Sequence, residues 1–289
     1  MKNTSATTVN PDVDDSPVSP HNESMAEPPR PRQIDTETGK RLHMALSATG
    51  DELFQVLLDP DMQVLRTALK NPHLHEDHLL TLLKRRDLGE DLLKAIHQLE
   101  TTKGSHRLKI ALVRNPNTPG QIALALLPHL HLFELVDLCM IPGVTPDQKF
   151  AAERAILQRL PTTELGNKMT LARRATATVV GEILKQGDAK LVEICLNSPR
   201  LREVAILQFI NGAHSSAETI SVIARHPKWK LRPNLRLAIL KNRRTPTIWF
   251  TLFLPQMRTP DVRNLLVSKR LNPAQKKLVQ DELKKRGMR

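Results

Sequence analysis

Basic side chains gather around a tryptophan in the last quarter of the chain. Residues 225–246 hold eight lysines and arginines together with Trp229. Ammonium and guanidinium groups bind phosphates and release counterions, and an indole ring can stack on an exposed base. The pattern therefore predicts a polyanion-binding site. Its candidate residues are Arg225, Lys228, Trp229, Lys230, Arg232, Arg236, Lys241, Arg243 and Arg244.

The charge balance also favours an anionic partner at this end of the chain. The 289 residues include 43 Lys and Arg and 30 Asp and Glu, which gives a formal net charge of +13. Residues 225–289 contain 18 basic and three acidic groups, whereas residues 1–37 contain three basic and seven acidic groups. Such asymmetry points to nucleic acid, an anionic membrane or an acidic protein as the partner. A polar, lysine-rich cap at the end of an array of repeats would explain the lysines but not the scarcity of carboxylates.

A second group with possible chemistry is the run HLHEDH, which contains His73, His75 and His78 together with Glu76 and Asp77. Imidazoles and carboxylates at this density can bind zinc or nickel. The spacing does not match His-Glu-x-x-His, in which two histidines share one helical face. The run also falls between a loop and a helix, where polar residues are common. We therefore expect surface histidines here and no metal site.

The sequence contains no recognisable catalytic set. It has no glycine-rich phosphate loop, no Gly-x-Ser-x-Gly turn and no set of metal ligands. His129 and His131, which flank an apolar stretch, give no stronger indication. We therefore expect a protein that is not an enzyme, with no catalytic residues and no cofactor.

The two cysteines indicate a reduced protein. Cys139 and Cys195 both lie in apolar runs, which predicts buried thiols. Two cysteines build neither a disulfide framework nor a four-cysteine metal site. No apolar segment follows Lys2 as in a secretion signal, and no window is long and apolar enough for a membrane span. These features predict a cytoplasmic protein.

Composition and proline spacing predict the elements that carry these residues. Hydrophobic residues make up 40% of the chain and aromatic residues 3%, with 11 glycines and 21 prolines. This balance suits many short helices and argues against a large sheet. Residues 1–37 lack any apolar periodicity and are predicted to be a disordered acidic tail. Residues 38–289 are predicted to be one helical domain, with early helices over 36–48, 51–58 and 61–70 that each end before a loop or an X-Pro pair.

Similar helix ends recur along the chain. Asn71, Asn115, Asn197 and Asn242 lie in such ends, at intervals of 44, 82 and 45. Because 82 is close to twice 41, the spacing predicts a repeating unit of roughly 40–45 residues, which is the length of a HEAT or armadillo repeat.

An ungapped comparison of the chain with itself, at an offset of 127, supports internal repetition. Residues 108–156 align with residues 235–283, and eleven positions are identical across four proline-marked breaks. Trp249 aligns with Ile122, which favours a core position for this tryptophan. The identical residues of the first segment are Leu108, Ala111, Asn115, Thr118, Pro119, Leu127, Pro128, Leu138, Pro146, Gln148 and Lys149.

The residue types within this unit predict how its helices begin and end. Asn115 is expected to close one helix in the left-handed conformation. Thr118 is expected to cap the next helix, with Pro119 as its first residue, and Thr145 with Pro146 to repeat this arrangement. Helices this short need neighbours to be stable in water, so the units are expected to stack into an α-solenoid.

The stop-and-start sequences NPNTP at 115–119 and NRRTP at 242–246 carry a family resemblance. With an Ala/Leu-rich helix before and a Leu-rich helix after, they resemble the leucine-rich-repeat-variant and HEAT-like α-solenoids of bacteria. The resemblance covers about residues 40–289 and implies a solenoid. The cysteine-rich, cluster-binding segment of some variant-family members is missing, so the resemblance implies no iron–sulfur role.

Taken together, the sequence predicts an all-α protein, an α-solenoid of degenerate HEAT-like repeats. The first functional hypothesis is a non-catalytic scaffold that binds a macromolecule, with a protein as the expected partner. The alternative is nucleic-acid binding through residues 225–289. A third hypothesis is an enzyme similar to the HEAT-like alkylpurine DNA glycosylases. It is disfavoured because the only carboxylates of that segment, Asp261, Asp281 and Glu282, are not beside the tryptophans.

Overall fold

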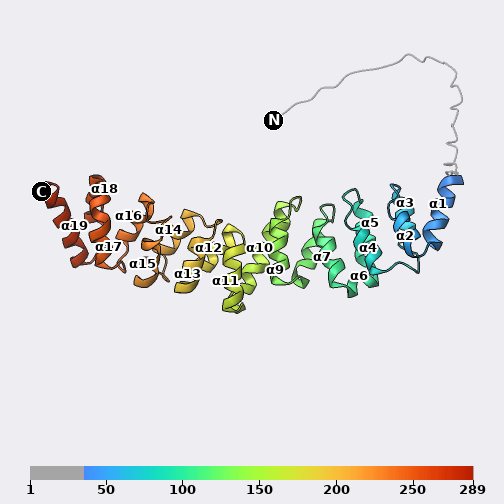
Figure 1. Cartoon of the computed structure of the whole chain (residues 1–289), viewed down its shortest axis with the longest axis horizontal. Helices are drawn as coiled ribbons and strands as arrows, with labels where there is room; N and C mark the ends of the chain where they lie inside the picture. Colours follow the sequence, from blue (N-terminus) through green and yellow to red (C-terminus); the bar gives the residue numbers. More distant parts are fainter. Residues whose placement is uncertain (1–35, 289) are drawn as a thin grey trace, which may run out of the picture.

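A computed structural model describes residues 36–288, and all the regular secondary structure within this range is helical. Figure 1 shows short helices that follow one another along one long axis, from α1 at one end to α19 at the other. The elements are α1 (Thr36–Ser47), α2 (Gly50–Val56), α3 (Met62–Ala68), α4 (Glu76–Leu82), α5 (Glu90–Gln98), α6 (Glu100–Gly104), α7 (His106–Arg114), α8 (Gly120–Leu126), η1 (Leu127–His129), α9 (Leu132–Met140), α10 (Pro146–Arg159), η2 (Leu160–Thr162), α11 (Leu165–Arg174), α12 (Ala177–Lys185), α13 (Ala189–Asn197), α14 (Glu203–Asn211), α15 (Ala217–Arg225), α16 (Pro233–Lys241), α17 (Thr247–Phe253), η3 (Leu254–Gln256), α18 (Thr259–Val267) and α19 (Pro273–Lys285).

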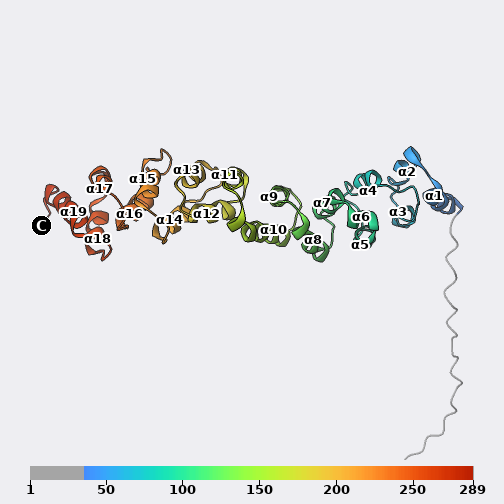
Figure 2. The same cartoon turned by 90° about the horizontal axis from the view of Figure 1, so that it is seen from below.

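The helices pack locally, in two layers that Figure 2 shows from below. In the first layer, α2, α4, α7, α9, α11, α13 and α15 each contact the next. In the second layer, α8, α10, α12, α14, α16 and α18 do the same. Because contacts join neighbours in the array, the all-helical and repeat-like character predicted from the sequence is confirmed.

A continuous apolar core runs between the layers. Each helix contributes buried side chains at helical spacing; in α12 these include Val179, Val180 and Ile183, all 0% exposed. Burying one such side chain stabilises the fold by about 1.5–3 kcal/mol. Since helices as short as these are marginal alone, this burial between neighbours holds the array together.

The offset of 127 recurs in the element boundaries. Helix α7 begins at His106 and α16 at Pro233, and α8 spans Gly120–Leu126 where α17 spans Thr247–Phe253. The same offset relates α2 to α12, α3 to α13, α4 to α14, α5 to α15, η1 to η3 and α9 to α18. The internal repeat predicted from residues 108–156 is therefore confirmed and extends over the whole described chain. We name residues 36–162 the first copy and residues 163–288 the second copy.

Equivalent helices of the two copies lie in opposite layers. Apart from α6, whose counterpart is only a turn, each copy contains nine α-helices within the described range, an odd number. Successive helices alternate between the layers, so the second copy begins in the other layer. Consequently α7 packs with α4 and α9 in the first layer, and its equivalent α16 packs with α14 and α18 in the second.

The repeating unit is shorter than the asparagine spacing suggested. Helices of one layer begin at shorter intervals: α2 starts at Gly50, α4 at Glu76 and α7 at His106, which are 26 and 30 residues apart. Asn71 and Asn115 each stand nine residues after the first residue of α3 and α7, but Leu99 holds that place in the unit of α5. Counting asparagines therefore skips a helix pair and yields too long a unit.

Asn115 ends α7 for a different reason from the one expected. Its backbone is extended, at φ −75° and ψ 125°, and not left-handed. The side-chain amide Nδ2 donates to the carbonyl oxygens of Leu83, at 2.9 Å, and Arg85, at 2.7 Å, in the turn after α4. Asn242 repeats this bond to the Ile210 carbonyl at 2.5 Å. Asn71, Asn115 and Asn242 recur because their amides bond to an earlier turn, whereas Asn197 lies one residue short of this place and bonds to Glu193 of its own helix.

The two predicted threonine caps have different outcomes. Thr145 caps α10 as expected: its Oγ accepts from the Gln148 backbone N–H at 3.3 Å. Thr118 does not cap α8, since its hydroxyl donates backwards to the Leu112 carbonyl at 2.6 Å and α8 begins after Pro119. Thr118 thus satisfies a carbonyl at the end of α7.

Two further predictions concern the start of the chain and membranes. The predicted disordered tail, residues 1–37, lies outside the described residues except for Thr36 and Glu37, which belong to α1. Among the helices of residues 36–288, none combines the length and the apolar character that a bilayer span requires.

Both cysteines are free and buried within the array, as predicted. Burial raises the pKa of the Cys139 thiol to about 11 and that of Cys195 to about 12. Because the thiolate is the reactive form, native-state labelling with a disulfide reagent at pH 8 should be slower than in the urea-unfolded chain by about a hundredfold or more. Rapid labelling of either thiol in the folded chain would contradict this burial.

Candidate docking site at the basic end of the array

Helix α16 divides the predicted basic residues into two groups. One group lies before the helix and in its first turn, and the other lies at its last residue and just beyond, with a helix of about 13 Å between its two ends at 1.5 Å per residue. The first consists of Lys228, Lys230, Arg232 and Arg236, and the second of Lys241, Arg243 and Arg244. Arg225 lies apart, at the end of α15, where it lines a cavity of about 430 Å³ with Glu193 and His226.

The first group is largely engaged in holding the fold. The Lys228 ammonium lies 4.3 Å from the centre of the Trp229 ring. Arg236 donates through Nε to the Lys230 carbonyl at 2.5 Å. Arg232 lies 3.9 Å from the Glu203 carboxylate. These contacts give the cations partners within the chain.

Neither tryptophan offers a ring face to a ligand. Trp229 is 3% exposed, and its indole N–H donates to the Leu196 carbonyl at 2.9 Å. Trp249 is 9% exposed and its indole N–H donates to the Ser221 hydroxyl, also at 2.9 Å. Stacking of a base on Trp229, which the sequence suggested, has no exposed surface to use.

The second group surrounds two adjoining cavities, of about 290 and 490 Å³, at the carboxyl ends of α14, α16 and α18. We call them together the basic cavity. Lys241 and Arg270 line both parts. Its other lining residues are Asn211, Gly212, Asn242, Arg243, Arg244, Asn264, Val267 and Ser268. Among the described residues, this lining contains four cations and no carboxylate.

Helix ends explain part of this charge. Three carboxyl ends meet here, and their exposed carbonyl groups favour nearby cations. Arg244 is engaged by the loop that follows α14, since its guanidinium donates to the carbonyls of Ala213, at 2.7 Å, and Ser215, at 2.6 Å. Lys241 and Arg243, in contrast, make no side-chain hydrogen bond or ion pair within residues 36–288. Interactions with carbonyl groups at the helix ends therefore do not account for these two cations.

Most carboxylates of residues 225–289 already form ion pairs with arginines of the same segment. Asp261 lies 3.6 Å from Arg258, and Glu282 lies 2.8 Å from Arg286. Two of the three acidic residues after position 225 are therefore paired locally, and most of the positive charge of this segment stays uncompensated.

Arg270 is the lining residue that the sequence-based prediction missed. Its guanidinium donates to the Asn211 side-chain oxygen at 3.3 Å, which joins α14 to the turn after α18. Arg270 follows Lys241 by more than one helix pair, so only the stacking of the layers brings the two side chains together.

The first copy has a cavity at the equivalent place. It measures about 570 Å³ and lies along α4 and α7. Lys84 and Arg114 line it, and the offset of 127 places them at Asn211 and Lys241 of the second copy. Arg86 and Arg107 add positive charge, but Arg107 is paired with Glu76 at 3.2 Å. The two cavities share no lining residue and lie along helices of different layers, so they are separate sites.

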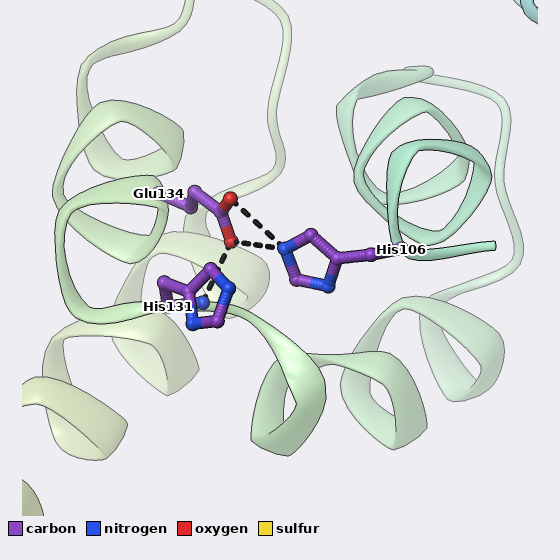
Figure 3. Close-up of side chains that lie close together, drawn as sticks. All are labelled: His106, His131 and Glu134. Atoms are coloured by element: carbon purple, nitrogen blue, oxygen red, sulfur yellow. Dashed lines mark hydrogen bonds and ion pairs between the residues drawn. The ribbon is translucent and has the colours of Figure 1, made fainter.

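Within the described residues, the histidine run at 73–78 serves the fold and does not form a metal-binding cluster. The expectation of surface histidines is wrong for His78, which is buried because its Nδ1 accepts from the His75 backbone N–H at 3.1 Å and so caps α4. The structure instead brings together His106, His131 and Glu134, which sequence spacing did not connect (Figure 3). Burial raises the pKa of Glu134, but hydrogen bonds from the His131 backbone and the His106 ring outweigh it and hold the pKa below its usual value.

Comparison with protein-family models, with curated proteins and with solved structures finds no match to this chain.

Proposed function

We propose that the protein is a non-enzymatic binding scaffold, an α-solenoid of degenerate HEAT-like repeats that docks an anionic macromolecule at the basic cavity. The single observation that carries this proposal is the pair Lys241 and Arg243, which have no partner among residues 36–288 and lie beside a cavity that these residues line without a carboxylate. Electrostatic complementarity would steer an anionic partner to this end of the array.

An acidic segment of a protein is the first candidate partner. Val267 lines the cavity beside Lys241 and is 81% exposed. Apolar side chains next to arginines are typical of protein interfaces. A segment that alternates carboxylates and apolar side chains would match both features.

Nucleic acid is the second candidate. The excess of 18 basic over three acidic residues from position 225 onward favours it. The buried tryptophans weigh against it, because neither indole has an exposed face to stack on bases. Any nucleic-acid binding would therefore rest on phosphate contacts and show little sequence preference.

Titrations with labelled probes separate these candidates. The full chain would be titrated into a single-stranded RNA, a DNA duplex and an acidic peptide of alternating Glu and Leu, at about 50 and 200 mM salt. Phosphate binding predicts that log K falls against log salt with a slope near −0.9 for each neutralised phosphate of duplex DNA. Peptide binding predicts a weaker salt dependence, since part of its affinity comes from apolar contact. If none of the three probes binds at the lower salt, the proposal fails.

A further inference from the structure

Three metal-binding side chains converge between α7 and the start of α9. His106 is the first residue of α7, while His131 and Glu134 stand just before and within the first turn of α9 (Figure 3). Each offers a ligand atom, and these atoms all lie within 4.8 Å of one another. We propose that His106, His131 and Glu134 bind a Zn²⁺ ion, with further coordination positions left to water or to a partner.

The distances suit a tetrahedral metal. Zinc ligands lie about 2.0–2.1 Å from the ion, so neighbouring ligand atoms are about 3.3 Å apart in a tetrahedral site. His106 Nε2 lies 2.9 and 3.0 Å from the two carboxylate oxygens of Glu134, within a few tenths of that spacing. The His131 ring lies with its centre 4.4 Å from that of His106. His131 is exposed, so a small rotation of its side chain would complete the set.

The backbone already orients two of the ligands. The His131 backbone N–H donates to Glu134 Oε2 at 2.6 Å, which fixes the carboxylate as outer hydrogen bonds do in known metal sites. The start of α7 is fixed as well, because the Ser105 hydroxyl accepts from the Leu108 backbone N–H at 3.1 Å. The Glu134 carboxylate and the helix start that carries His106 are thus placed before any ion arrives, and only the His131 ring has to rotate.

The second copy shows that the fold does not require these residues. At the equivalent positions it has Pro233, Arg258 and Asp261, and the Arg258 Nε lies 3.6 Å from the Asp261 carboxylate. An arginine–aspartate pair therefore serves at the start of α18 where histidine and glutamate stand at the start of α9. The histidines replace a purely structural ion pair with groups that also bind metals.

Zinc binding would be measured on the tag-free full-length chain by equilibrium dialysis with metal analysis, and independently by the absorption of Co²⁺ as a spectroscopic substitute. We expect one Zn²⁺ per chain and the intense visible bands of four-coordinate Co²⁺. The double variant H131R/E134D rebuilds the ion pair of the second copy, so it keeps the helix start while it removes the His131 imidazole and leaves a carboxylate that is one methylene shorter and paired with the new arginine. It should bind at least 100-fold more weakly, with an unchanged circular dichroism spectrum.

The matched control is H73Q/H75Q, which removes two histidines from the run at 73–78 and should bind zinc like the parent chain. Retention of zinc by H131R/E134D, or its loss in H73Q/H75Q, would place the ion elsewhere and overturn the proposal. Absence of binding at millimolar Zn²⁺ would overturn it too. None of these results bears on the basic cavity, so this inference stands or falls separately from the proposed function.

Discussion

Asn115→Ala is expected to lower the free energy of unfolding by about 3–5 kcal/mol, because each buried group left without a partner costs about 1–3 kcal/mol. The change removes the donor to the Leu83 and Arg85 carbonyls and the acceptor of the Asn117 backbone N–H. Asn115 is 3% exposed, so water cannot replace these bonds without opening the array. Urea unfolding followed by circular dichroism would measure the loss.

The second copy offers the equivalent substitution, and an exposed asparagine elsewhere serves as the control. Asn242→Ala in the second copy removes the equivalent bond to Ile210 and should also lower stability, but by less, because Asn242 is half-buried and donates to one carbonyl only. Asn167→Ala, on the exposed surface of α11, should change stability by no more than about 0.5 kcal/mol. If Asn115→Ala behaved like Asn167→Ala, the side-chain bonds between units would not contribute to stacking.

Reversing two charges of the basic cavity should have the largest effect on binding. The variant K241E/R243E puts carboxylates in place of the two cations that lack a partner in the described part of the chain. Lost attraction and new repulsion together should weaken binding of an anionic probe by about 100-fold at low salt, which corresponds to about 2.7 kcal/mol. The affinity of the best-binding RNA, DNA or peptide probe, measured by fluorescence anisotropy, gives the result.

The control variant must change the net charge by the same amount as K241E/R243E, but at a site outside the basic cavity. K276E/K277E does so on α19, away from the cavity lining, and should weaken binding only a few-fold through the general field. Equal losses in the two double variants would mean that the probe senses overall charge and not the cavity. K84E/R114E tests the equivalent cavity of the first copy in the same way.

Local features of the sequence predicted the helices well. Proline-marked ends placed the early helices, since the residue before proline avoids the α region. The ungapped match between residues 108–156 and 235–283 predicted the duplication, because insertions would have disrupted the stacking that buries each helix. Apolar runs around Cys139 and Cys195 correctly predicted buried thiols.

Features that depend on packing between units could not be predicted from the local sequence. The asparagine spacing gave too long a unit, because Leu99 stands in the place of an asparagine after α5. The role of Asn115 was mistaken because its partners lie 30 and 32 residues earlier in the chain. Equivalent helices of the two copies lie in opposite layers because each copy, within the described residues and apart from α6, has an odd number of helices, and no local sequence pattern predicts this placement.

In the candidate sites, too, the local sequence predicted some residues, and packing between units determines the others. Clustered charge identified Lys241 and Arg243, but Arg270 joins them only through the stacking of α14, α16 and α18. His106 and Glu134 are 28 residues apart and are not repeated in the second copy, so neither spacing nor repetition drew attention to them. Trp229 looked available for stacking because sequence gives residue type and not burial, whereas the alignment of Trp249 with Ile122 correctly predicted a core position for that residue.

Hydrogen–deuterium exchange on the full chain tests the docking site most directly. The chain would be compared free and saturated with the best-binding anionic probe. Docking at the basic cavity predicts slower exchange in peptides covering residues 241–246 and 267–271, at the ends of α16 and α18, with little change in the first copy. Slower exchange spread along both copies, or confined to α4 and α7, would contradict this placement of the partner.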